Sequence, residues 1–463
     1  MRRLQSLVIA VALAGVGCAG LPPKPKPVQL TSTAPLDGFE VASGGDWPAV
    51  EWWKRYQDPT LDQLIELAVG TSPSLATAHA RYDSARQSVR VAGAASGAHV
   101  EASADIERQR LSDNGLIPPQ LLGFTWYNQA DLGLQASYTF DWWGKQRALV
   151  EAAVDQAHAA QAERSAAALM LASSIADTYF GWQADQARLA LALDRARIVE
   201  REGAIAAERV KADLDPADDT QRSELALAGT REQIAALEGS AQLRVVALAG
   251  LAGRSIGELP ALQAKPLPAL SGNLPDDVKI DLIARRADIT ASRWRVEAAE
   301  RNLDSARAEF FPDVTINALL GLSSIDVGKL LEYGSRVPQA TAAIHLPIFD
   351  SGRLKARYGA SQAAIDSAVA SYRETLVGAA QDVATQASTR AHIVAQRTQR
   401  SLEVEAARRL ESSAAARAIS TLSRAWRTSS GAIALSASKG SRFARSASAR
   451  ANSSFLVSMT ESY

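Results

Sequence analysis

The stretch that decides the fold is DLGLQASYTF, residues 131–140, in which apolar and polar side chains alternate. The even-numbered positions, from Leu132 to Phe140, share one face of a strand because successive side chains of a strand point to opposite sides. A tilted strand of about ten such residues can cross a bilayer with lipid on one face and water on the other. The stretch therefore predicts a membrane-spanning β-strand.

The same alternation occurs three more times, over residues 100–107, 314–320 and 340–348. Four strands cannot close a barrel, and lipid does not tolerate an open sheet edge, so several chains must contribute strands to one barrel. Two chains would give eight strands, about the number that side chains fill, whereas three would give twelve and leave a lumen. We therefore expect a trimer that forms a channel.

The flanks of the strands also repeat. Five positions before each strand pair correspond without a gap: Pro73 with Ala287, Leu75 with Ile289, Arg81 with Arg295, Ala85 with Ala299 and Val89 with Leu303. After the strands, Phe140, Asp141, Gly144 and Lys145 correspond to Phe349, Asp350, Gly352 and Arg353. The plan is two copies of helix, strand, strand, helix.

A long helical hairpin is predicted after the first strand pair. From Gly144 to Leu251 the only proline is Pro216, and apolar residues recur there at helical spacing. Two helices joined near Pro216 would form a hairpin roughly 100 Å long at 1.5 Å per residue. The apolar stripe is narrow and rich in alanine, which favours coiled-coil packing over burial in a globular core.

Composition excludes several classes of function. The 463 residues contain 50 Lys and Arg against 50 Asp and Glu, which gives no bias toward nucleic acid. The five histidines are scattered, and we find no phosphate loop, dinucleotide-binding motif or nucleophile elbow. We expect no catalytic, cofactor-binding or metal-binding residues, and no spanning helix after the N-terminus. A secreted enzyme on a helical scaffold is disfavoured for the same reason.

The N-terminus is predicted to be a targeting segment. Residues 1–17 contain Arg2 and Arg3 followed by an apolar run, which is typical of a signal peptide. Cys18, the only cysteine, is the candidate lipidation site, with residues 18–37 as an extended tether. Gly15 stands where lipoprotein signals usually have leucine, so an ordinary signal peptide with an incidental cysteine is the alternative.

Several motifs together resemble one protein family. They are Trp52, Trp53, Tyr56, Asp58, Pro59 and Leu61; Tyr138, Phe140, Asp141, Trp143, Gly144 and Lys145; Arg285, Arg286, Asp288 and Ile289; Phe311 and Pro312; and Leu346, Pro347, Phe349, Asp350, Gly352 and Arg353. The chain resembles the outer-membrane efflux protein family, the TolC-like channels, and within it the lipoprotein branch called OprM or NodT type.

The resemblance implies a mixed α+β membrane protein, in which each chain of a homotrimer gives four strands to a twelve-stranded outer-membrane barrel and continues into an α-helical periplasmic tunnel. Such a channel would passively conduct substrates to the exterior from an inner-membrane pump, of resistance-nodulation-division type, through a periplasmic adaptor. Localisation is then the outer membrane, where the chain is lipid-anchored and contacts membrane lipid, with a large periplasmic portion. Residues 38–258 form the first repeat and residues 259–410 the second.

The resemblance also assigns the turn between the long helices. Five residues match the tip that meets the adaptor in the family: Lys211, Asp213, Leu214, Asp215 and Pro216. Asp213, Asp215, Asp218 and Asp219 could form an acidic ring that gates the pore and favours cations, or could belong to a solvated, helix-capping turn. Arg285 and Arg286 are interpreted as structural charges.

Residues 411–463 depart from the repeat. They contain 15 serines and only two acidic residues, Glu411 and Glu461, so we expect helical periodicity to fade there. A disordered tail and a reading-frame shift both explain this composition. Reading back-translated residues 421–430 in another frame gives a leucine- and acid-containing sequence that resembles the family after its second tip. A channel made defective by this altered C-terminus and a non-conducting, lipid-anchored coiled-coil protein are the alternative functions.

Overall fold

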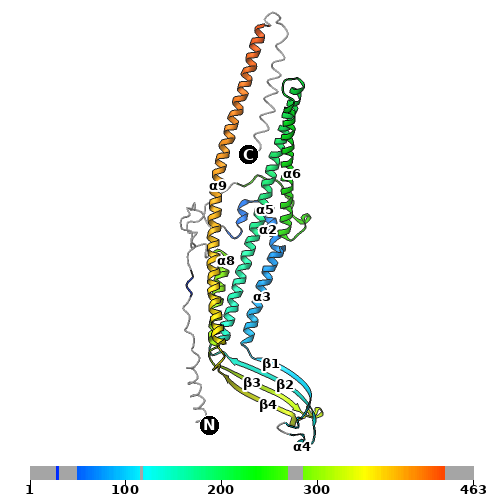
Figure 1. Cartoon of the computed structure of the whole chain (residues 1–463), viewed down its shortest axis with the longest axis vertical. Coiled ribbons are helices and arrows are strands. Elements are labelled where there is room, and N and C mark those ends of the chain that lie inside the picture. The colour runs from blue at the N-terminus through cyan, green and yellow to red at the C-terminus, as the bar shows by residue number, and fades with distance from the viewer. Residues whose placement is uncertain (1–27, 31–48, 115–117, 269–284, 433–463) are drawn as a thin grey trace. The chain divides into compact units, whose positions relative to one another are not determined.

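The computed structural model describes residues 28–30, 49–114, 118–268 and 285–432 (Figure 1). The chain divides into two compact units, Met1–Ala384 and Thr385–Tyr463. Helix α9, Arg353–Ala432, has residues in both units. All the described strands and the other described helices belong to the first unit.

Four strands form one antiparallel sheet in the order β1-β2-β3-β4 (Figure 1). Their bounds are His99–Arg110, Trp126–Phe140, Asp313–Ser324 and Arg336–His345. The four predicted strands are thus confirmed, but β4 ends at His345 and the expected continuation to Ile348 is wrong. Pro347 explains this end because it has no N–H for a ladder and restricts the residue before it.

Short elements occupy the ends of the strands away from the long helices. Helix α4, Pro119–Leu122, lies between β1 and β2. Two 3-10 turns, η4 at Val327–Lys329 and η5 at Tyr333–Ser335, connect β3 to β4.

The first half of the chain packs around α5, Lys145–Lys211 (Figure 1). Turn η2, Trp52–Tyr56, and helix α2, Pro59–Thr71, cover it near its middle, and α3, Pro73–Ala95, runs along it. Their shared core contains residues of α2, α5 and α6: Leu61, Leu64, Ile65, Leu171, Ile175, Tyr179 and Leu248.

The predicted helical hairpin is confirmed. Helix α5 has 67 residues and α6, Asp218–Ala252, has 35, and the two pack along each other. At about 1.5 Å per residue, α5 is about 100 Å long. Helix α6 ends at Gly253 in the left-handed conformation, and turn η3, Ile256–Glu258, follows.

The second half repeats this arrangement. Helix α8, Ala287–Ala308, contacts α5 extensively, as its counterpart α3 does. A second core joins α8 to the first part of α9 through Ile289, Val296, Tyr372 and Leu376. The sequence repeat therefore corresponds to a repeat of packed elements.

Both strand pairs pass into a long helix through the same kind of turn. Gly144 and Gly352 have φ angles of 76° and 88°, a left-handed conformation that glycine adopts without strain. Asp141 accepts backbone N–H bonds from Gln146 and Arg147 at 3.1 and 2.8 Å. Asp350 caps α9 in the same way, with bonds from Gly352 and Leu354 at 3.1 and 2.8 Å.

Two sequence expectations about helices need correction. Helix α6 is long and apolar enough, by length and composition alone, to cross a membrane, although we expected no such helix. The helix packs along α5, but only 17% of its apolar window is buried within the chain. Helix α9 also continues to Ala432 instead of fading near Glu411, because alanines at 414–416 and 418 offset the poor helix propensity of the serines.

Candidate functional site

The sheet has one apolar and one polar face. Each strand register pairs even-numbered residues with even-numbered residues, as in Ala102 with Leu134 and Leu134 with Leu320. The third register pairs Leu320 with Pro338. The apolar set of every strand therefore lies on one face, as a membrane-crossing sheet requires.

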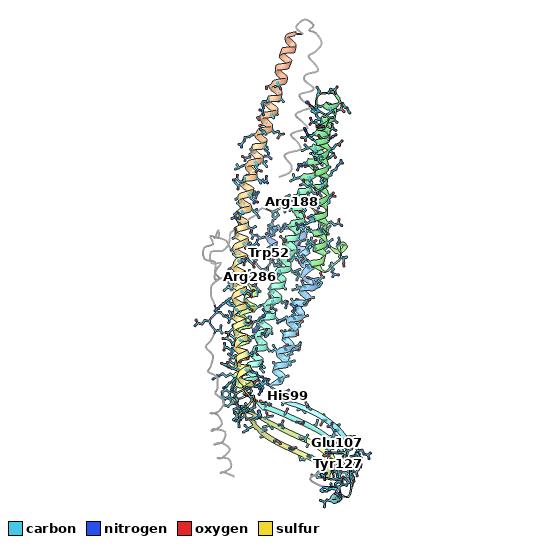
Figure 2. All side chains as sticks on the ribbon, viewed as in Figure 1. Trp52, His99, Glu107, Tyr127, Arg188 and Arg286 are labelled. Atoms are coloured by element: carbon cyan, nitrogen blue, oxygen red, sulfur yellow. The ribbon has the colours of Figure 1, made fainter. Side chains whose placement is uncertain are left out.

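The opposite face carries hydrogen-bonding groups. Thr139 and Thr315 share a hydrogen bond of 3.0 Å across β2 and β3, and Gln129 donates to Asp131 at 2.9 Å. Figure 2 places His99 at the end of the sheet near the helices and Glu107 and Tyr127 at the far end. Polar residues thus follow this face along the length of the sheet.

Aromatic residues gather at both ends of the strands. Near the helices, Tyr138, Phe140 and Trp142 form a row of ring contacts, with centroids 5.0 and 5.5 Å apart. At the far end, Trp126 belongs to the same even-numbered, apolar set and pairs with Arg110. Aromatic girdles at both interfaces are typical of strands that span a membrane.

The strand–helix junction is held by a stacked pair and a shared carboxylate. Trp143 stacks on Phe311 with centroids 4.5 Å apart and donates its indole N–H to the carbonyl of Pro312 at 3.0 Å. Glu309 lies 3.9 Å from Lys145 at the start of α5 and 3.0 Å from Arg357 of α9. Glu309 therefore ties together the starts of both long helices.

The tip between α5 and α6 is a tight, charged turn. Asp213 has a φ angle of 54°, and the Leu214 N–H donates to the Arg209 carbonyl at 2.9 Å. Arg209 donates to both carboxylate oxygens of Asp215, at 2.6 and 2.9 Å, which lowers the pKa of Asp215. Lys211 binds Glu208 at 2.7 Å.

The four tip carboxylates do not form one equivalent set. Asp215 is neutralised by Arg209, and Asp219 lies 2.8 Å from Arg222. In the described part of the chain, Asp213 and Asp218 have no cation within ion-pair distance. Leu214 and Pro216 complete the turn, and Leu214 is 66% exposed. A pore-facing acidic ring would therefore depend on Asp213 and Asp218.

A polar network anchors the segment around α2 to α5. Tyr179 donates to Asp58 at 2.6 Å and accepts from Gln183 at 2.9 Å, while Lys265 donates to the other Asp58 oxygen at 2.7 Å. Burial opposes ionisation of Asp58, but the bonds from Lys265 and Tyr179 outweigh it and lower its pKa. Burial, together with Asp58, raises the pKa of Tyr179 to about 12.

A second network ties α5 to α6. Asp185 has a side chain only 3% exposed and accepts from Arg244 at 2.6 Å and from Ser240 at 2.8 Å. Burial alone would raise the pKa of Asp185, but these hydrogen bonds lower it. Gly181 leaves the room for this contact, because a Cβ there would overlap the Arg244 guanidinium.

Arg286 pairs with carboxylates on two helices. It donates to both oxygens of Asp288, at 3.1 and 2.7 Å, and to Asp382 of α9 at 3.1 Å. These bonds join the start of α8 to α9.

The predicted features at the two ends of the sequence are not covered by the described residues. Cys18, the signal peptide of residues 1–17, the tether of residues 18–37 and residues 433–463 lie outside the residues described, apart from 28–30. Among the described residues, no cluster of three or more His, Cys, Asp or Glu side chains could hold a metal ion.

Sequence reasoning missed both buried networks. Tyr179 and Gln183 are one helical turn apart on a buried stripe, which is the only local sign of the first network. Asp185 interrupts the apolar stripe of α5 and could have been identified as a buried charge that needs a partner.

Known proteins of one family are similar to this chain over most of its length. The outer membrane efflux protein family matches residues 64–254 and 280–421. The multidrug resistance outer membrane protein MdtQ of Escherichia coli O157:H7 is 32% identical over 387 residues, covering 81% of this chain and 80% of MdtQ. MdtP of the same strain, also described as a multidrug resistance outer membrane protein, is 31% identical, with 83% and 79% covered.

A solved structure is also similar to this chain. The outer membrane protein VceC of Vibrio cholerae superposes with a TM-score of 0.69 at 32% identity, covering 76% of this chain and 83% of VceC. A two-faced sheet joined to long helices defines a subunit of a membrane channel. The chain belongs to the outer membrane efflux protein family. The predicted family, mixed α+β class and efflux-channel function are confirmed.

Proposed function

We propose that three copies of this chain close a twelve-stranded outer-membrane barrel and continue as a helical tunnel. The observation that carries the proposal is the continuous apolar face across β1 to β4. In a single chain, β1 and β4 would be open edges of this four-stranded sheet. Open edges in lipid are costly, so pairing of β1 with β4 of a neighbouring copy would remove them.

The channel passes small molecules outward without chemistry of its own. Relatives described as multidrug resistance proteins support drugs as the substrate class. The pump would be of the resistance-nodulation-division type, coupled through a periplasmic adaptor that meets the tip at Lys211 and Leu214. The exposed Leu214 and the charges around it suit a protein contact.

Two proposals concern the ends of the sequence. Cys18 is the lipidation site that anchors the mature protein to the outer membrane. Residues 411–463 result from a reading-frame shift, in the gene or in its sequence. In the first repeat, the tip residue Asp213 follows the first residue of α5, Lys145, by a fixed number of positions in the sequence. The same number counted from Arg353, the first residue of α9, places a second tip at residue 421. The family match ends at that residue, whereas α9 continues beyond it as a helix.

Planar-bilayer recording of the purified protein tests the channel directly. Trimers that resist detergent and produce unitary current steps would support the duct. Trimers without current would favour a channel made defective by its altered C-terminus, and a monomer without current would favour a lipid-anchored coiled-coil protein. Mass spectrometry of the C-terminal peptides, with resequencing across codons 409–430, tests the frame shift.

A further inference from the structure

The apolar face of the sheet ends in arginines at the end away from the helices. Arg108 and Arg110 continue the even-numbered set of β1 beyond Ile106, and Arg336 begins the even-numbered set of β4. The registers pair Arg110 with Trp126 and Arg336 with Leu322. Guanidinium groups therefore share a face with the residues that contact lipid.

Two of these arginines are held by aromatic rings. The guanidinium of Arg108 lies 5.5 Å from the ring centroid of Trp126, and that of Arg336 lies 4.2 Å from the ring of Tyr333. Within the described residues no carboxylate is within ion-pair distance of Arg108 or Arg336, whereas Arg110 lies 3.3 Å from Asp113. Stacking on a ring fixes the plane of a guanidinium while its N–H edge stays free.

The other end of the same face lacks such charges. There the even-numbered strand positions are Val100, Phe140, Val314 and Ile344. Between the two ends, the ten steps from Ala130 to Phe140 span about 34 Å along the strand, or roughly 26 Å for a 40° tilt, the height of an apolar band. The registers place Arg108 opposite Asn128, just beyond this span, and Arg336 opposite Leu322 and Leu132, at its outer edge. The charges therefore lie at one end of the apolar face only.

We propose that Arg108 and Arg336, with Trp126 and Tyr333, form a binding surface for phosphate-bearing lipid headgroups of the outer leaflet. An arginine fork matches the geometry of a phosphate group, and the adjacent rings suit the boundary between headgroup and acyl chain. Position selects lipid over soluble anions, because both arginines directly extend the apolar face. In the proposed trimer, arginines of two neighbouring copies would line the same part of the rim.

Native mass spectrometry of the full-length trimer with diphosphoryl lipid A tests this surface. The variant Arg108→Gln/Arg336→Gln should bind it at least about tenfold more weakly, while Arg108→Lys/Arg336→Lys should lose less because charge remains. Arg90→Gln, on the exposed face of α3, is the matched control and should bind as the wild type does. Millimolar inorganic phosphate should not displace the lipid.

Three results would overturn the proposal. One is equal binding of diphosphoryl and dephosphorylated lipid A, another is unchanged affinity in the glutamine variant, and the third is displacement by inorganic phosphate. The inference rests on the sheet crossing the outer membrane as part of the duct. Current steps in planar bilayers distinguish failure of the lipid-binding proposal from failure of the proposed channel function. The glutamine variant should conduct as the wild type does even when its lipid affinity is lost.

Discussion

Tyr179 of α5 donates its hydroxyl hydrogen to Asp58, which precedes α2, over a distance of 2.6 Å. Tyr179 is fully buried, and its oxygen also accepts from Gln183. This relationship joins the start of the first repeat to the middle of the long hairpin helix. Loss of this hydrogen bond should weaken the packing of η2 and α2 against α5.

Replacing Tyr179→Phe should lower the free energy of unfolding by about 1–2 kcal/mol, because it removes two buried hydrogen bonds but keeps the ring. The melting temperature of the trimer in detergent measures the effect. Tyr82→Phe, on α3, is the matched control, since its ring contacts Arg86 and Arg164 without a role in this network. An equal loss in both variants would argue against the network.

The Asp58 carboxylate should make stability depend on pH. Its pKa is lowered in the folded protein, so the unfolded chain binds its proton more readily. The contribution is therefore complete above the unfolded value of about 3.9 and is lost as pH falls through the folded pKa. The difference in melting temperature between wild type and Asp58→Asn should be constant from pH 7 to 5 and shrink below about pH 4. A constant difference down to pH 3 would contradict this.

Removing the cation from the α5–α6 network should cost more than removing both charges. Arg244→Met leaves Asp185 buried without its main partner and should cost about 2–3 kcal/mol, allowing for partial exposure of Arg244. Asp185→Leu/Arg244→Met should recover part of that loss. A double-mutant cycle in thermal or chemical denaturation measures the coupling, and additive effects would show that the two residues are independent.

Gly181→Ala should reproduce part of the Arg244 effect, because the added methyl group displaces the guanidinium.

Gly253→Ala should also destabilise the protein, by about 1–3 kcal/mol, since residue 253 has a φ angle of 64° and a Cβ there would clash with Pro73. Gly250→Ala, inside α6, is the control, because a methyl group there meets nothing within 4 Å. It should be neutral or slightly stabilising. Denaturation midpoints compare all three.

The tip predicts two opposite changes in ion selectivity. Asp213→Asn should reduce the preference for cations, because it removes a carboxylate at the proposed aperture that has no ion-pair partner among the described residues. Arg209→Gln should increase the preference, because it frees Asp215 from its two hydrogen bonds. Reversal potentials under a KCl gradient measure both, with Arg90→Gln as the control. No shift in either variant would exclude the tip from the pore.

The strands and the hairpin could be predicted because their signals are local. Alternation over residues 131–140 and one isolated proline at 216 specify these elements without distant contacts. The Asp58 network could not, since Tyr179 and Lys265 stand 121 and 207 residues from Asp58 in the sequence. Arg108 was missed because its charge interrupts the apolar/polar alternation in the sequence, although the strand register keeps it on the face of the even-numbered residues. The helix beyond Glu411 was missed because serine content was weighed without the alanines.

The matching turns at Gly144 and Gly352 bear on symmetry. Each half of the chain supplies two strands and enters its long helix through the same aspartate-capped, left-handed glycine. A chain of half this length could build the same barrel from six identical copies. Joining two halves in one polypeptide replaces a sixfold axis with a threefold axis, and the second half becomes free to diverge. A wall built in this way can move alternate segments independently, which a strictly sixfold ring cannot do.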